Sequence, residues 1–153
     1  MLQAIVNGEI FDGASLISDK AVLIEGGRIR ELVDADQLPD AVVDIYDLQG
    51  GILTPGFIDL QVNGGGGVLF TATPTVECLR SMGAAHRATG TTGFLPTLIS
   101  SDYSVMREAV AAVEQAIAEG VPGVLGIHLE GPFLNPQRRG VHDAGKFCAL
   151  DQA

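Results

Sequence analysis

Two side chains suited to metal binding or acid–base chemistry, His128 and Glu130, stand two residues apart in the segment 128–132 (HLEGP). Residues two apart on a strand share a face, so both would point the same way. A carboxylate at a strand end, before a rigid Gly-Pro exit, is well placed to bind a metal or move protons. The ordinary alternative is a histidine satisfied within a sheet and an exposed glutamate at a loop start.

A second polar pair, Gln61 and Asn63, precedes four glycines at 64–67. Both amides could point into one pocket, although neutral amides bind transition metals more weakly than imidazole or carboxylate groups. The alternative is a polar strand end beside a flexible turn. No Lys-Ser/Thr pair follows the glycines, and they do not match GxGxxG, so a phosphate-binding loop is not expected.

The third group lies on the segment 138–142 (RRGVH), just after Glu130. Positive groups beside a strand-end pocket suit an anionic substrate, and His142 could hydrogen-bond to it. Arg138 and Arg139 also fit an ordinary solvated surface. His86 lies in a predicted helix and is expected on its surface or packed within it.

The elements that must position these residues change character near residue 50. Before it, apolar alternation predicts strands at 2–6, 21–24, 29–33 and 42–48, with hairpin turns at Asn7-Gly8 and Gly26-Gly27. After it, buried-looking strands at 57–62, 92–99 and 123–129 alternate with helices at about 75–89 and from an N-cap at Ser101 to about 118. This order is typical of a parallel α/β sheet, at whose carboxyl edge sites form. The tail from residue 133 is expected to be loop.

Composition restricts the class of protein. The 153 residues carry 19 acidic and 9 basic side chains, a formal net charge of −10, with 46% hydrophobic residues. Such a chain packs a core, and its acidity argues against nucleic acids and anionic membranes as partners. No apolar run approaches the ~20 residues of a membrane span. The start lacks a signal peptide, and the distant Cys78 and Cys148 are expected to be reduced thiols, so we expect a cytoplasmic protein.

Taken together, three segments of the chain resemble conserved motifs of the amidohydrolase superfamily. The segment 53–64 (LTPGFIDLQVNG) is similar to its first barrel strand, with Gln-x-Asn in place of the usual His-x-His. With residues 95–98 (LPTL) and 128–133 (HLEGPF), it resembles the N-acetylglucosamine-6-phosphate deacetylase family. The resemblance extends to about residue 147. It implies an α/β fold: a small β-sandwich segment at 1–50, then at 51–153 the first βα units of a (β/α)8 TIM-type barrel, incomplete in this chain.

The resemblance also implies an activity, in which a metal-activated water hydrolyses the acetamide of an amino-sugar phosphate. Glu130 matches the family's metal-ligand glutamate, and Val141 and His142 match a substrate-contacting pair. Gln61 and Asn63 occupy positions where other members bind a second metal, which implies one divalent metal, zinc above iron or manganese. His128 receives no fixed role and could lie behind the ligands.

The family's two histidine ligands and its proton-transferring aspartate lie beyond residue 153. A complete barrel needs about 250 residues, so we expect an N-terminal portion that is inactive alone and joins a homo-oligomer. Two alternatives stay open: a portion of another amidohydrolase, against which Gln-x-Asn argues, and a non-catalytic α/β module that associates to cover its sheet edges.

Overall fold

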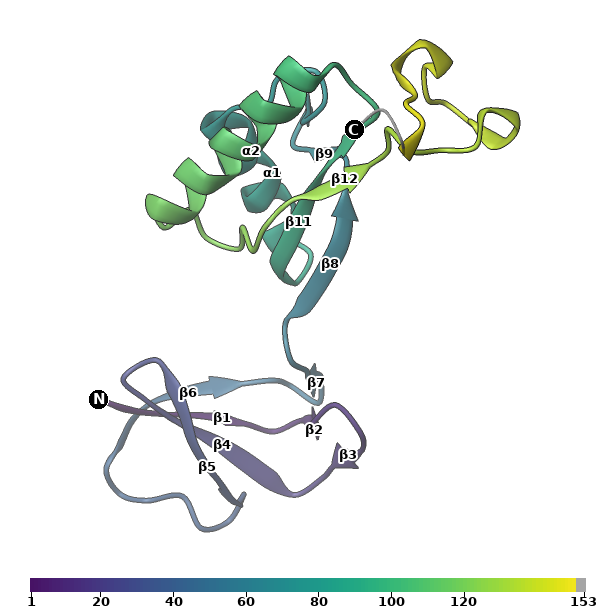
Figure 1. Cartoon of the computed structure of the whole chain (residues 1–153). Coiled ribbons are helices and arrows are strands. Elements are labelled where there is room, and N and C mark those ends of the chain that lie inside the picture. Colours follow the sequence, from purple (N-terminus) through teal and green to yellow (C-terminus); the bar gives the residue numbers. More distant parts are fainter. Residues whose placement is uncertain (151–153) are drawn as a thin grey trace. The chain divides into compact units, whose positions relative to one another are not determined.

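The computed structural model describes residues 1–150 and divides into two compact units, Met1–Pro55 and Gly56–Ala153 (Figure 1). The change of composition near residue 50 lies about five residues before this division. Each unit is described by itself.

The first unit consists of two small mixed sheets with strand orders β5-β4-β1-β6 and β3-β2-β7. Its strands are β1 (Leu2–Val6), β2 (Glu9–Phe11), β3 (Leu16–Ile17), β4 (Lys20–Glu25), β5 (Arg28–Asp34), β6 (Val42–Asp47) and β7 (Ile52–Leu53). The sequence prediction of β structure before residue 70 is confirmed, because no helix occurs before Val76.

The two predicted hairpin turns have different outcomes. Strands β4 and β5 pair antiparallel around Gly26 and Gly27, whose φ angles of 59° and 75° allow the tight turn that links them. The hairpin predicted at Asn7-Gly8 is wrong. Strand β1 pairs with β4 and β6, whereas β2 pairs with β3 and β7, so this turn carries the chain from one sheet to another.

The second unit is built on a parallel sheet with strand order β12-β11-β8. Its elements are β8 (Phe57–Val62), β9 (Gly64–Gly65), β10 (Val68–Leu69), α1 (Val76–Arg87), β11 (Thr91–Ile99), α2 (Tyr103–Ala118) and β12 (His128–Glu130), with short 3-10 turns at Pro136–Arg138 and Ala144–Lys146. The strand–helix alternation predicted from the sequence is thus confirmed.

Two details of this unit differ from the prediction. The third strand, expected at 123–129, is ordered as a strand only at His128–Glu130, with a single bridge between Val124 and Phe94 before it. The N-cap of α2 is Asp102 and not Ser101, whose hydroxyl instead donates to the carbonyl oxygen of Ile99 at 2.9 Å.

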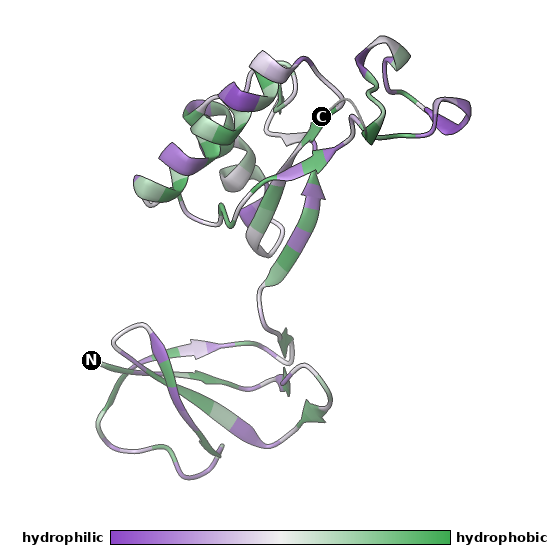
Figure 2. Cartoon of the chain, viewed as in Figure 1, coloured by the Kyte–Doolittle hydropathy of each residue, from purple (hydrophilic) through white to green (hydrophobic). Residues whose placement is uncertain are grey.

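The core of the second unit lies between the sheet and the helices α1 and α2. Figure 2 shows the green, hydrophobic faces of both helices and of β11. Leu79 and Met82 of α1 pack with Phe94 and Leu98 of β11 and with Phe70, and all are buried. This packing fixes β11, the central strand, and therefore the strand ends that carry polar residues.

The architecture as a whole combines mixed sheets with few helices. In the described part of the chain, neither α-helix has the length and apolar character needed to cross a membrane.

Candidate functional site

The candidate site lies at the carboxyl ends of the parallel strands. The register pairs Thr97 with His128 and Ile99 with Glu130, which brings the last residues of β11 and β12 side by side. Strand β8 runs parallel to β11 on its other side and ends at Val62. Because parallel strands end at one sheet edge, the polar segments after them converge there.

Gln61 and Glu130 meet at this edge, although 69 residues separate them. The Gln61 side-chain amide donates a hydrogen bond to Glu130 Oε2 at 3.0 Å. The backbone N–H of Gln61 in turn donates to Asp59 Oδ1 at 3.0 Å. The amide therefore holds one oxygen of the carboxylate in place and leaves the other for a different partner.

His142 is that second partner. Its Nε2 lies 3.4 Å from Glu130 Oε1, and its Nδ1 lies 3.0 Å from the hydroxyl oxygen of Ser100. The imidazole is buried and its ring packs near that of Phe147. The structure thus brings together three residues predicted from the sequence, Gln61, Glu130 and His142.

His128 occupies a separate position in the same edge region. Its Nδ1 lies 3.1 Å from Thr97 Oγ1, and Thr97 is completely buried. A direct contact between His128 and Glu130 is not among the interactions of residues 1–150. The threonine therefore orients this imidazole from the neighbouring strand.

Asn63 and the glycines form an ordered turn. The Asn63 carbonyl accepts a hydrogen bond from Phe70 N at 2.9 Å, and β9 pairs antiparallel with β10. His86 of α1 fixes this turn, because its Nε2 lies 2.9 Å from the Gly64 carbonyl oxygen. A Cβ atom at Gly65 would lie 2.7 Å from the same nitrogen, which explains a glycine there.

The loop after β12 presents the remaining predicted residues. Val141 is 90% exposed, and Arg138 and Arg139 are also exposed. The loop is tied to the start of α2 by Lys146, whose Nζ donates to both carboxylate oxygens of Asp102 at 2.8 and 2.7 Å. These hydrogen bonds raise the pKa of Lys146.

Ser100 and Thr97 were missed in the sequence analysis. Both lie on or directly after the strand Thr91–Ile99, and both contact a predicted histidine. Their position at a strand's carboxyl end was a usable signal.

The donor set for a metal is incomplete in the described residues. Across residues 1–150, no group of three or more His, Cys, Asp or Glu side chains is placed to hold a metal ion. A catalytic zinc site normally takes three protein ligands. Glu130 is a carboxylate of the type that binds divalent metals, but the described residues do not complete a set of three ligands around it.

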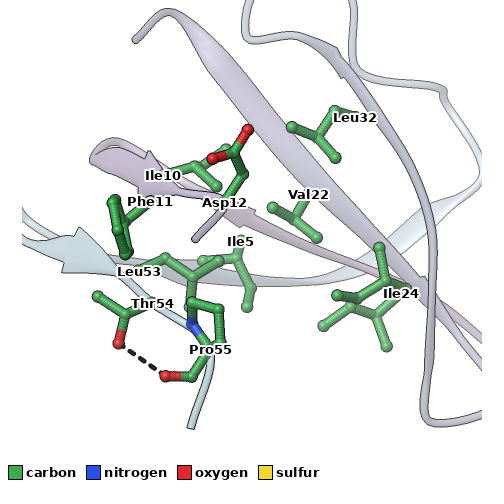
Figure 3. A pocket seen from close by; sticks show the side chains of 11 residues that line it. Ile5, Ile10, Phe11, Asp12, Val22, Ile24, Leu32, Leu53, Thr54 and Pro55 are labelled. Atoms are coloured by element: carbon green, nitrogen blue, oxygen red, sulfur yellow. Dashed lines mark hydrogen bonds between the residues drawn. The ribbon is translucent and has the colours of Figure 1, made fainter. Parts of the chain in front are cut away.

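The first unit contains a cavity of about 420 Å³ with a different lining (Figure 3). Most of its lining residues are aliphatic, including Ile5, Ile10, Val22, Ile24, Leu32 and Leu53. Its carboxylate, Asp12, accepts hydrogen bonds from the backbone N–H groups of Ser15 and Ala14, which lower the pKa of the carboxyl group. This lining does not supply the converging polar groups found at the sheet edge.

A protein-family model described as NagA composite domain matches residues 2–53. An N-acetylgalactosamine-6-phosphate deacetylase of a Shewanella species is 55% identical over 97 residues, which cover 63% of this chain and 25% of that protein. An N-acetylglucosamine-6-phosphate deacetylase of Haemophilus influenzae is 37% identical over 142 residues, which cover 93% of this chain and 37% of that protein.

The fold is also similar to a solved structure. A crystal structure of N-acetylglucosamine-6-phosphate deacetylase from Pasteurella multocida matches with a TM-score of 0.92 and 35% sequence identity, over 98% of this chain and 39% of that one. The chain thus spans well under half of the length of these relatives.

Proposed function

We propose that this chain belongs to the family of N-acetylglucosamine-6-phosphate deacetylases and that the protein it forms part of hydrolyses the acetamide of a 2-acetamido sugar 6-phosphate to the free amine and acetate. The observation that carries the proposal is Glu130, held at the carboxyl edge of the parallel sheet between Gln61 and His142. The similarity to curated deacetylases over most of the chain supports the choice of reaction.

Glu130 is the residue that we assign to a divalent metal. When bound, such a metal lowers the pKa of a coordinated water and polarises the amide carbonyl. We assign the remaining ligands, two histidines, and the proton-transferring aspartate to polypeptide outside the described residues. Zinc is the metal we expect, with iron or manganese as alternatives that accept the same ligand types.

Gln61 supports this role of Glu130. Its amide donates to Oε2 and so limits rotation of the carboxylate, whose Oε1 lies on the side of His142. Gln61 and Asn63 are neutral amides, which bind transition metals weakly, so we propose one metal ion and not two. His128, oriented by Thr97, lies behind this site and is not assigned a ligand role.

Val141 and His142 are the residues that we assign to the substrate. Val141 is free to contact a sugar because its side chain is exposed. His142 is buried against Glu130, so a substrate group that reaches the carboxylate also reaches the imidazole. The exposed Arg138 and Arg139 precede this pair and would favour an anionic substrate over a neutral one.

The remaining proposals concern the whole protein. We propose that residues 1–50 belong to a small β-sandwich domain and that residues 51–153 supply the first three βα units of a (β/α)8 barrel. We also propose a cytoplasmic homo-oligomer that acts on small sugar phosphates. A portion of another amidohydrolase, or a non-catalytic associating module, would replace this proposal if the test below fails.

A second substrate is favoured by one observation. The Shewanella relative, at 55% identity over 97 residues, is named for N-acetylgalactosamine 6-phosphate, the epimer of the glucose-derived substrate at C4. The proposal therefore includes both epimers, and the ratio of their kcat/KM values decides between them.

The test uses this chain alone and a chimera in which it replaces the matched N-terminal part of the Haemophilus influenzae relative. Released amine and acetate are measured with both sugar phosphates, together with bound metal per chain. We expect the chain alone to be inactive and the chimera to turn over substrate with bound metal. A chimera that folds like its parent, with the same circular dichroism and Tm, but has no activity would contradict the proposal.

The variant Glu130→Gln in the chimera tests the ligand assignment. It should abolish turnover mainly by loss of metal. The matched control is Glu108→Gln, which makes the same substitution at an exposed position of α2 away from the site. If Glu130→Gln kept both metal and turnover, the assignment of Glu130 would be wrong.

A further inference from the structure

The loop after β12 closes on itself and contains the two residues that we assign to the substrate. The backbone N–H of Cys148 donates to the Pro132 carbonyl oxygen at 3.2 Å, so the two ends of the segment 132–148, the 132–148 loop, meet. Compact surface loops with closely spaced ends are packed by their own side chains and are frequently functional. Whatever attaches this loop to the rest of the unit therefore decides where Val141 and His142 lie.

Lys146 attaches the loop to the start of α2. Its Nζ donates to Asp102 Oδ1 and Oδ2 at 2.8 and 2.7 Å. A second contact lies beside it, because the Tyr103 hydroxyl hydrogen-bonds with the Cys148 side chain, which raises the pKa of the phenol. Elsewhere the loop meets the unit through His142 at the sheet edge. Within residues 1–150, side chains of the loop thus bond to the rest of the unit at two places, the sheet edge and the start of α2.

A short 3-10 turn joins Lys146 to His142. The turn spans Ala144–Lys146, and its N-cap, Asp143, accepts a backbone hydrogen bond from within the turn at 2.9 Å. The backbone N–H of Lys146 in turn donates to the Asp143 carbonyl oxygen at 3.0 Å. Directly after the turn, the centroid of the Phe147 ring lies 6.2 Å from that of the His142 ring. A displacement of Lys146 is therefore passed to His142 through hydrogen-bonded backbone and a ring contact.

The contact with Lys146 is unfavourable for the helix that it touches. Asp102 is the N-cap of α2, a position from which a carboxylate commonly accepts a hydrogen bond from a backbone N–H of the first turn. Its side chain makes no such bond and gives both oxygens to Lys146 instead. The lysine also brings a positive charge to the positive end of the helix dipole. Because α2 loses a cap in this arrangement, the benefit of the contact lies with the loop.

We propose that Lys146 and Asp102 are positioning residues that hold the 132–148 loop, and with it Val141 and His142, at the sheet edge. The use of this pair in substrate binding rests on the proposed function. Neither side chain needs to touch the substrate, because both act through the loop. The two side chains are partly exposed, and an exposed ion pair of this kind changes the ratio of attached to detached loop by about two- to fivefold.

The structural test measures hydrogen exchange of the loop amides by NMR in the full 153-residue chain. The N–H groups of His142 and Cys148 are both hydrogen-bonded within the loop and report its attachment. Lys146→Met should speed their exchange about two- to fivefold. Lys146→Arg keeps the charge and should leave the exchange close to that of the unaltered chain. Unchanged exchange in Lys146→Met, or an equal increase in Lys146→Arg, would overturn the proposal.

Asp102→Asn separates the ion pair from the capping of α2. Asparagine is as good an N-cap as aspartate, so the helix keeps its start while the charge that binds Lys146 is lost. This variant should speed exchange of the loop amides as much as Lys146→Met does, and the double variant should add nothing further. Fully additive effects of the two substitutions would mean that they act independently and would contradict the pair.

The matched control is Lys20→Met, which breaks the Lys20–Asp34 ion pair of the first unit. The side chains of that pair are 37% and 52% exposed, close to the 34% and 62% of the Lys146–Asp102 pair. Lys20→Met should leave exchange of the loop amides unchanged. An increase equal to that of Lys146→Met would show a general effect of removing a surface charge, and the specific role of the pair would be refuted.

The kinetic arm uses the chimera described above. Because bound substrate itself favours the attached loop, Lys146→Met should raise KM by as much as about fivefold and leave kcat nearly unchanged. Lys146→Arg should recover most of the change in KM. An unchanged KM in a variant whose loop exchanges faster would overturn the positioning role.

The two proposals fail separately. A folded but inactive chimera, together with faster exchange of the loop amides in Lys146→Met, contradicts the proposed function and supports the hold of this pair on the loop. An active chimera in which Lys146→Met changes neither KM nor the exchange of the loop amides contradicts the inference and leaves the proposed function standing.

Discussion

The two units of this chain differ in how much of their sheets is covered. In the first, the buried cluster consists of Leu2, Ala4 and Leu23, while Ile29 and Tyr46 on other positions of the same sheet are exposed. In the second, the sheet and the helices α1 and α2 enclose a core that includes several large, fully buried side chains. The polar residues that converge at one edge belong to the unit with the larger core.

This difference indicates why the chemistry is placed where it is. A site needs side chains held to within a fraction of an ångström, and packed elements supply that rigidity better than thinly covered ones. Ser100 directly follows β11, which the core fixes in place, and Glu130 ends β12, which pairs with β11. The aliphatic cavity of the first unit has no comparable group of converging polar side chains among its lining residues.

The largest expected effect is on the core of the second unit. Phe94→Ala removes a ring that is 1% exposed, and we expect the free energy of unfolding of this unit to fall by about 3–5 kcal/mol. Hydrogen exchange of the β11 amides under increasing urea measures it. Phe57→Ala, at a position that is 60% exposed, is the control and should cost well under half as much. Equal costs would mean that the core is not where we place it.

A smaller loss of unfolding free energy is expected for a core substitution in the first unit. Leu23→Ala empties a position that is 0% exposed, and the cost should be about 2–3 kcal/mol, at the low end for buried leucines, because a thinly covered sheet can relax. Exchange of the β4 amides reports it, with Ile29→Ala, 72% exposed, as the control. A loss as large as that of Phe94→Ala would remove the contrast between the two units.

Substitutions in the turn between β4 and β5 should lower the free energy of unfolding by less than Leu23→Ala does. Gly26 has a φ of 59°, and a Cβ atom there would meet nothing within 4 Å, so the cost of Gly26→Ala is conformational, about 1–2 kcal/mol. Gly26→Asn should lose much less, because asparagine tolerates this region and Asn-Gly suits the turn. Thermal unfolding by circular dichroism compares them. Equal losses for Ala and Asn would refute the conformational explanation.

The smallest effect concerns the surface link between α1 and α2. Hydrogen bonds from Gln115 and then Arg80 lower the pKa of Glu119. The stabilisation is therefore present above the ordinary carboxyl pKa and is lost as the pH falls through the lowered value. Glu119→Gln should reduce Tm slightly at neutral pH, and this difference should shrink as the pH falls through the lowered pKa. A difference that persists in acid would show that charge is not its cause.

The glycine turn and the strand–helix alternation illustrate what a local pattern can predict. Gly26-Gly27 gave a hairpin because two consecutive positive φ angles suit that turn, and Thr75 caps the helix predicted to begin near it. Asn7-Gly8 has an equally good local signal, yet the strands on either side of it pair with others. Turn chemistry sets what the backbone can do at one point, whereas pairing depends on which strands the whole unit brings together.

For the candidate site, the sequence by itself determined the residue types and their positions at strand ends, since the period of two on a strand and the common edge of parallel strands follow from local geometry. That reasoning placed Gln61, Glu130 and His142 among the candidates. Only the tertiary structure decided that the Gln61 amide contacts one carboxylate oxygen of Glu130 and His142 the other. It alone showed that Ser100 reaches His142, because that contact joins residues 42 apart through a bend at Gly131 that no pattern in the sequence encodes.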